Sequence, residues 1–446
     1  MFLGFLAAVG TAVGLRGIYR YGYIGQDFLV HLHLIQSFPR LPWSILYVQT
    51  TPPGLYWLGS LIRNHVSSFH FLEVIALAFL AFNIAGLWII YGLLWRSIAS
   101  WQMRYSAAAF ATLIPFRVVH SIVIAADAFA LPIFALVALF TLRLFGNPRS
   151  LGSWVAVSLC LSIGMVCKYT FSGMLPAVAL LLAVAVGTRL RKGERLRWGV
   201  VGVLALALPS EVFLLEMAES SRVSGTVTSL VWLRKGEAPV MRWNDILLPK
   251  RGDLGLLSAP EFFRDKIYEV RKYSYPGLLH VSSFTDVMNL FQQPPTEIPT
   301  EWAARVQKPF LRDRTALSQA FQAWSVRWCL VYSALAVAGT LYCGVLSAAS
   351  LALRRPLLPD ATVVITVLAV GFFSPVFFTL TRVTDPYEGA YWLPRLVLPA
   401  LLVFFTLGFV ALDSLCRSAT PPRTTFLNVF AGFTLVACLL FVGVLG

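Results

Sequence analysis

Four ionisable residues of this chain have types and positions that suit group transfer at a membrane. Two are carboxylates, Asp27 and Asp127, and Asp127 interrupts the apolar run Ala125-Ala126-Asp127-Ala128. Two are cations, Lys168 and Arg395. A carboxylate takes a proton from a hydroxyl group, and a cation stabilises a departing phosphate as its negative charge grows. The set therefore suits a reaction between a lipid phosphate and a polar acceptor.

A rigid turn follows Asp27 in the sequence Thr50-Thr51-Pro52-Pro53-Gly54-Leu55-Tyr56-Trp57. Pro52 and Pro53 each fix φ and restrict the residue before them, so we expect this stretch to hold a loop in place rather than to react. Thr51 and Tyr56 belong to the same positioning group. His31 stands one helical turn after Asp27 and is predicted to contact the same acceptor.

Each candidate also has a purely structural interpretation. Asp27 would then be a solvated loop carboxylate, and Asp127 a helix cap. Lys168 would only extend its ammonium group to the membrane interface, and Arg395 would do the same beside interfacial aromatic residues. His31 would be an ordinary packing residue.

The elements that must position these residues are membrane helices. The chain is 58% hydrophobic and 13% charged, and its mean hydropathy is +0.73. This is far more apolar side chain than one soluble core would bury, so we expect an all-α polytopic membrane protein. About 20 apolar residues span the bilayer as a helix. We identify about eleven such runs, near 1–15, 71–95, 103–117, 121–142, 151–167, 170–188, 198–216, 326–351, 358–380, 394–412 and 424–445.

Basic residues give the orientation, because short cytoplasmic loops are enriched in Lys and Arg. With a cytoplasmic amino terminus, the inner loops hold thirteen cations: Arg96, Arg104, Arg143, Arg149, Arg189, Arg191, Lys192, Arg195, Arg197, Arg354, Arg355, Arg417 and Arg423. The short outer loops hold few, among them Arg117. The long loops 16–70 and 217–325 then face outward. Asp27, Asp127, Lys168 and Arg395 all fall on this outer side, where they are predicted to meet in one membrane-level cavity.

Three parts follow from the distribution of spans. Residues 1–216 form an N-terminal transmembrane catalytic module with seven spans and the first outer loop. Residues 217–325 form a long extracytoplasmic loop between spans 7 and 8, and residues 326–446 form a C-terminal module of four spans. In the long loop, 260–272 alternates apolar and charged residues, so it is predicted to be an interfacial amphipathic helix.

Several functional classes are disfavoured. The net charge of +15 is explained mostly by topology, so we expect no nucleic-acid partner. The six cysteines lie in or at the ends of spans, which indicates neither a disulfide framework nor a metal site. No nucleotide-binding motif of the G-x-x-x-x-G-K-[ST] type occurs.

At these positions the chain resembles the GT-C glycosyltransferases that use polyprenyl-phosphate-linked sugars. The shared pattern is an early outer acidic residue, the diproline followed by Leu-Tyr-aromatic, Asp127, Lys168-Tyr169-Thr170, and a late Pro-Arg-x-x-x-Pro beginning at Pro394. The order is similar to that of protein O-mannosyltransferases and lipid A aminoarabinose transferases. The string Thr-Thr-Pro-Pro-Gly-Leu-Tyr is also similar to dolichyl-phosphate-glucose α-1,2-glucosyltransferase.

The resemblance implies a GT-C-like fold and an inverting transfer of a hexose or pentose to an acceptor hydroxyl on the extracytoplasmic face. Asp27 would be the general base, Asp127 would shape or polarise the site, and Lys168 and Arg395 would bind the carrier phosphate. The donor would be a polyprenyl-phosphate-linked sugar, and the acceptor a glycan, lipid or protein. Phe28 stands where relatives have a second acidic residue, so no metal site is assigned and a divalent metal requirement is left open.

Two other functional classes remain. A transporter or flippase of lipid-linked saccharides would require interrupted helices and charges at mid-depth in matching halves. A non-catalytic membrane scaffold would leave the carboxylates and the diproline unexplained. The charges at the outer ends of the spans favour the enzyme, and we expect it in the plasma (inner) membrane of a bacterium, among membrane lipids.

Overall fold

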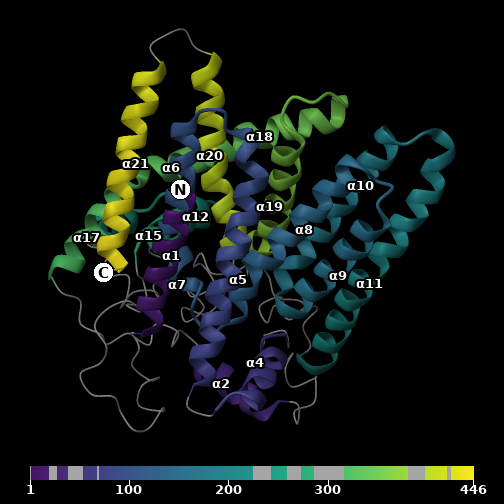
Figure 1. The fold of residues 1–446 in the computed structure, drawn as a ribbon, viewed down its shortest axis with the longest axis horizontal. Coiled ribbons are helices and arrows are strands. Elements are labelled where there is room, and N and C mark those ends of the chain that lie inside the picture. The colour runs from purple at the N-terminus through teal and green to yellow at the C-terminus, as the bar shows by residue number, and fades with distance from the viewer. Residues whose placement is uncertain are drawn as a thin grey trace.

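The protein is helical throughout the part of the chain that the computed structural model describes, namely residues 2–19, 28–38, 54–67, 70–224, 243–258, 273–285, 316–379, 397–418 and 423–445. No strand occurs within these ranges. Figure 1 shows long helices packed side by side, with the short helices α2 and α4 below the end of α5. The predicted all-α polytopic fold is therefore confirmed.

The N-terminal half contains α1 (Phe2–Tyr19), α2 (Phe28–Ser37), α4 (Gly54–His65), α5 (Phe71–Leu94), α6 (Trp101–Leu113), α7 (Pro115–His120), the 3₁₀ turn η2 (Ala126–Phe129), α8 (Ala130–Gly146), α9 (Leu151–Cys167), the 3₁₀ turn η3 (Tyr169–Gly173), α10 (Met174–Arg189) and α11 (Lys192–Ser224). The rest contains α12 (Trp243–Leu247), α13 (Arg251–Ser258), α15 (Tyr275–Phe284), α17 (Ala316–Trp328), α18 (Leu330–Leu353), α19 (Asp360–Thr379), α20 (Leu398–Ser418) and α21 (Arg423–Leu445).

Each predicted apolar run coincides with one of these helices or with a consecutive pair. Among the described residues, nine segments are long and apolar enough to cross a membrane. The other two predicted spans are α9, which has 17 residues, and the stretch that α6 and α7 share. The total of about eleven spans stays a prediction.

The α6–α7 stretch is broken by Pro115. A proline disfavours helical geometry in the residue before it, and Ile114 is extended, with φ −54° and ψ 126°. Thus α6 ends after 13 residues, which is too short to cross the hydrocarbon region alone. Residues 114–125 that follow are all buried, although most of them lie outside any long helix.

Close packing joins the two transmembrane modules predicted from the sequence. Gly173 of η3, in the N-terminal module, meets the backbone of Gly371 in α19, in the C-terminal module. Within the C-terminal module, a Cβ atom on Gly339 of α18 would lie 2.5 Å from the Cα atom of Gly408 in α20. Glycine allows two helices to approach to backbone contact, which is the common way of packing helices in membranes.

Ion pairs show which helix ends share a face. Arg149 pairs with Glu194 at 2.6 Å and Arg189 pairs with Asp360 at 2.5 Å, and all four residues lie at ends that the charge distribution assigns to the cytoplasm. We call this the inner end of the bundle and the opposite one the outer end. The contacts agree with the alternation of spans.

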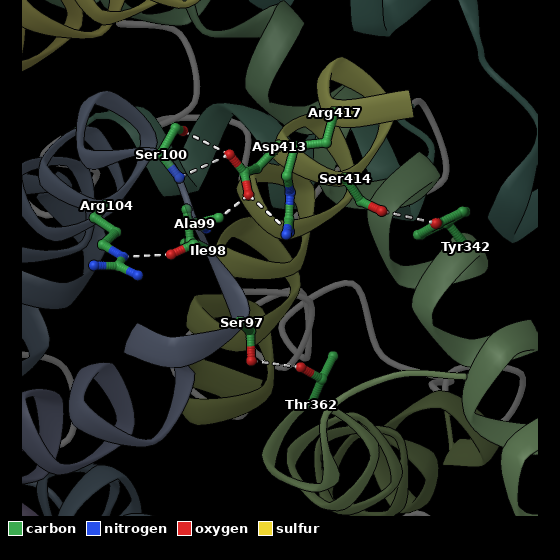
Figure 2. A network of polar contacts seen from close by, with 10 residues as sticks. All are labelled: Ser97, Ile98, Ala99, Ser100, Arg104, Tyr342, Thr362, Asp413, Ser414 and Arg417. Carbon is green, nitrogen blue, oxygen red and sulfur yellow. Dashed lines mark hydrogen bonds and ion pairs between the residues drawn. The ribbon is translucent and has the colours of Figure 1, made fainter. Parts of the chain in front are cut away.

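The inner end is closed by a group of polar contacts, the inner clasp, formed by Ser97, Ala99, Ser100, Thr362 and Asp413 (Figure 2). The Asp413 carboxylate accepts hydrogen bonds from the backbone of Ala99 at 2.8 Å and from the backbone and hydroxyl of Ser100 at 3.1 and 2.6 Å. Thr362 bonds to Ser97 at 2.6 Å. The clasp fastens the α5–α6 connection to α19 and α20.

The long segment between spans 7 and 8 is partly inserted in the bundle. Helix α11 continues to Ser224 and α17 begins at Ala316, so the helices intrude on both ends of the predicted loop. Between them α15 is buried: the ring of Phe284 lies 6.2 Å from Phe110, 5.5 Å from Phe405 and 6.0 Å from Phe441, centre to centre. The predicted amphipathic helix at 260–272 lies outside the described residues.

Candidate functional site

Four of the predicted site residues lie within the described part of the chain: His31, Tyr56, Asp127 and Lys168. The structure joins them in two pairs. The remaining predicted residues, which are Asp27, Thr51, Pro52, Pro53 and Arg395, lie outside the described residues. Their roles, and the cavity in which all were predicted to meet, stay predictions.

Asp127 and Lys168 form a buried ion pair. The Lys168 ammonium group donates to Oδ1 of Asp127, and the side chains are only 4% and 12% exposed. Asp127 lies in η2, directly before α8, and Lys168 ends α9 with an extended backbone, φ −160° and ψ 126°. Because α8 and α9 are consecutive and antiparallel, the start of one meets the end of the other. Away from water, the attraction between the two charges is stronger than at a protein surface.

The contacts of Asn83 show how far the Asp127–Lys168 pair lies from the outer end of the bundle. Its side-chain amide donates to the carbonyl of Ala128 at 2.8 Å, beside Asp127, and to the carbonyl of Phe79 at 2.9 Å. Asn83 is twelve residues after the first residue of α5, which corresponds to about 18 Å along the helix. The ion pair is therefore recessed well below the outer end of α5, whereas the sequence predicted charges at the outer ends of the spans.

The first outer loop reaches this site through α4. A Cβ atom on Gly54, the residue after the diproline, would lie 2.5 Å from Sγ of Cys167 and 3.1 Å from the carbonyl oxygen of Val166. Only glycine fits there without displacing its neighbours. The beginning of α4 thus rests against the residue directly before Lys168.

His31 and Tyr56 connect α2 to α4. Their side chains are buried, and His31 Nδ1 lies 3.1 Å from the Tyr56 hydroxyl. A hydrogen bond of 3.1 Å from the Ser60 hydroxyl in α4 to the carbonyl of Phe38, the residue after α2, also connects them. Since α2 begins at Phe28, directly after Asp27, these contacts link the chain next to Asp27 with the helix that packs beside Lys168.

Arg117 is a buried cation whose position was predicted wrongly from the sequence. It was assigned to a short outer loop, but it lies in α7 inside the bundle and is 0% exposed. Its Nη2 atom donates to the carbonyl of Thr112, while Nε and Nη1 have no hydrogen-bond partner in the described part of the chain. A count of apolar residues cannot reveal that the helix stops partway across the bundle. Pro115, two residues earlier, was the available signal.

Possible metal ligands do not cluster in the described ranges. No group of three or more His, Cys, Asp or Glu residues is arranged there to bind an ion. No disulfide joins the cysteines, all six of which lie in the described ranges, and four of them are buried: Cys167, Cys329, Cys343 and Cys438. The described site thus offers acid–base and electrostatic groups.

Comparison with known families identifies one match. Residues 50–213 match the model of the dolichyl-phosphate-mannose-protein mannosyltransferase family. This range includes Tyr56, Asp127 and Lys168 as well as the diproline. The resemblance to GT-C glycosyltransferases is confirmed over this part of the chain, and the match supports a membrane glycosyltransferase. No curated protein matches the chain.

Among solved structures, the chain is similar to the crystal structure of the Archaeoglobus fulgidus oligosaccharyltransferase tethered to an acceptor peptide that contains the NVT sequon. The identity is 12%, the TM-score is 0.43, and the alignment covers 99% of this chain and 55% of that one. The chain thus spans about half the length of that protein.

Proposed function

We propose that this protein is a polyprenyl-phosphate-dependent glycosyltransferase that moves a hexose or pentose to an acceptor hydroxyl, with inversion, on the extracytoplasmic face of the membrane. The observation that carries the proposal is the buried Asp127–Lys168 pair, recessed within the bundle and contacted through Cys167 by the helix that follows the diproline. The pair and this helix both lie within the region matched by the mannosyltransferase family model.

The reaction exchanges one bond for another at the anomeric carbon of the sugar. The acceptor loses its hydroxyl proton to a base, and its oxygen forms a bond to this carbon. The bond from the same carbon to the carrier phosphate breaks, and the phosphate leaves with the electron pair. A carboxylate lowers the barrier to removal of the hydroxyl proton, and a cation lowers the barrier to departure of the phosphate.

Each site residue has a place in this scheme. Asp27 acts as the general base, and Asp127 orients the reacting groups. Lys168 holds the carrier phosphate from one side, as a point charge, and Arg395 contributes a planar guanidinium. In the structure Asp127 neutralises Lys168, so an arriving phosphate competes with this carboxylate for the ammonium group. His31 and Tyr56 position the loop and the acceptor, together with Thr51, Pro52 and Pro53.

The polyprenyl chain stays in the bilayer during the reaction, which is the reason for an enzyme embedded in the membrane. The donor is a polyprenyl-phosphate sugar, and the acceptor is a hydroxyl group of a glycan, a lipid or a protein. We place the enzyme in the plasma membrane of a bacterium. No metal is assigned to the reaction.

The test uses the full chain in proteoliposomes with a polyprenyl-phosphate-linked, labelled sugar. Transfer to an added acceptor is measured, together with binding of the donor. Asp27→Asn is expected to abolish transfer and to leave donor binding largely intact, and retained transfer would refute the assignment of the base. Asp360→Asn is the matched control, because this carboxylate is exposed at the inner end.

One observation favours the alternative, a transporter or flippase of lipid-linked saccharides. The interrupted α6–α7 stretch with the buried Arg117 is a feature that transport proteins use. The same proteoliposomes separate the two functions. Movement of the labelled lipid between leaflets, without transfer of the sugar, would indicate the transporter.

A further inference from the structure

Arg117 carries a positive charge that no described neighbour balances. It is wholly buried, its hydrogen bond to Thr112 uses a neutral carbonyl, and neither Nε nor Nη1 has an acceptor among the described residues. It takes part in no ion pair with a described residue. Burying an ionised group without a partner is costly, and in membrane proteins such charges are usually functional.

The described helices that pack against α7 do not supply the missing anion. Helix α7 packs against α1, α6, α15, α20 and α21. Of these five, α1, α6, α15 and α21 contain no acidic residue, and α20 contains only Asp413. Asp413 is already bonded to Ala99, Ser100 and Arg417 at the inner end.

The guanidinium group is also deep in the bundle. Its Nη2 atom lies 3.7 Å from the position of a Cβ atom on Gly10, and one turn further along α1, a Cβ atom on Gly14 would overlap Leu80 of α5. Gly10 is therefore level with the middle of α5, far from either end. No headgroup of the surrounding bilayer reaches this depth without entering the protein.

A buried backbone segment connects Arg117 to the proposed catalytic site. Every residue from Ile114 to Ala125 is buried, and Asp127 follows two residues later. Irregular backbone at membrane depth is tolerated where it is enclosed by protein or lines a polar cavity. Arg117 and Asp127 are thus opposite ends of one enclosed segment.

We propose that Arg117 is an oxyanion-binding residue that receives a phosphate group at the α6–α7 break. Arginine is well suited to phosphate because its planar N–H groups match the phosphate oxygens. The source we assign is the phosphate of the lipid carrier, an assignment that rests on the proposed function. The binding of a phosphate oxyanion by Arg117 does not depend on sugar transfer.

Binding to the detergent-solubilised full chain tests the proposal with three probes: a short-chain polyprenyl monophosphate, the polyprenol without phosphate, and inorganic phosphate. Arg117→Gln is expected to weaken binding of the polyprenyl phosphate by about tenfold to a hundredfold, the effect of losing charged hydrogen bonds. Binding of the polyprenol should not change. The matched control is Arg104→Gln, because Arg104 is also on α6–α7 and also donates to a backbone carbonyl, that of Ile98, but near the inner end.

Arg117→Lys keeps the charge without the planar group and should bind the polyprenyl phosphate about tenfold less tightly than the wild type. If Arg117→Gln does not fold, the affinity of Arg117→Lys for the polyprenyl phosphate tests the proposal by itself. Unchanged affinity in both folded variants would overturn the proposal and leave Arg117 as a cap on the carbonyls of α6. Binding of inorganic phosphate in place of the lipid would overturn the assignment to the carrier. Arg117-dependent lipid binding without sugar transfer would support this site and refute the proposed function.

Discussion

Removing either partner of the Asp127–Lys168 pair should destabilise the protein strongly, while removing both should cost much less. Asp127→Asn leaves a buried ammonium group without its counter-ion, and Lys168→Met leaves a buried carboxylate. Only 4% of the Lys168 side chain and 12% of the Asp127 side chain are exposed, so water cannot replace the lost partner. The double variant leaves no charge unpaired.

The magnitude follows from this burial. Breaking a buried ion pair by removing one partner costs about 3–5 kcal/mol, whereas replacing both partners by neutral groups of similar volume is often near neutral. The Arg149–Glu194 pair is the internal control. It is as well formed, at 2.6 Å, but its side chains are 51% and 37% exposed. Such an exposed pair contributes little to stability, because water and salt screen its charges.

The assay is a double-mutant cycle on the free energy of unfolding, measured in bicelles. The expected coupling energy between positions 127 and 168 is about 3 kcal/mol or more, and that between 149 and 194 should be much smaller. If both pairs gave the same small coupling, the 127–168 site would be open to water. The reasoning that a phosphate meets a poorly screened Lys168 would then fail.

Three further outcomes are expected. Gly54→Ala should lower stability by about 1–3 kcal/mol and reduce sugar transfer, because its Cβ atom would overlap Cys167 Sγ. Adding Cys167→Ala should restore part of the stability and part of the transfer. The control is Gly92→Ala, whose Cβ atom would meet nothing within 4 Å and which should have little effect. Asp413→Ala should cost about 1–2 kcal/mol by removing the hydrogen bonds from Ala99 and Ser100, without changing donor affinity. Burial lowers the pKa of His280 from 6.5 to about 4. Between these two pH values the unfolded chain binds a proton at His280 and the folded chain does not, so the free energy of unfolding should fall by about 3 kcal/mol as the pH drops from 6.5 to 4. Thermal unfolding of the His280→Gln variant should not show this pH dependence.

Much of the architecture could be predicted because a bilayer leaves few solutions. A backbone inside hydrocarbon must satisfy its own hydrogen bonds, so a long apolar run predicts a helix. Each predicted run indeed coincides with a helix or a consecutive pair of helices in the structure. The contact between Asp127 and Lys168 also follows from order alone, since consecutive antiparallel spans bring the start of one beside the end of the other.

The depth of a residue between the two ends of the bundle could not be predicted, because hydrophobicity is nearly constant along a span. The apolar pattern therefore does not distinguish a position of Arg117 inside the bundle from one in a loop, and only Pro115 marks the interruption of the helix. It also could not show that α15 enters the bundle, since Phe284 makes its contacts with residues more than 100 positions away, Phe110, Phe405 and Phe441. The tight fit of Gly54 is likewise a tertiary contact without a local signal.

The inner clasp bears on the choice between an enzyme and a transporter. Alternating access requires one group of helices to rock against another, which opens the inner end in one state. Here the hydroxyls of Ser97 and Thr362 and the carboxylate of Asp413 join the two halves by hydrogen bonds at that end. Rocking would break them and leave a buried carboxylate without its donors, at a cost of several kcal/mol. The proposed active site lies toward the opposite end and requires no such movement. A fixed inner end and a recessed, charged outer site are what an enzyme needs when its lipid substrate enters from the membrane.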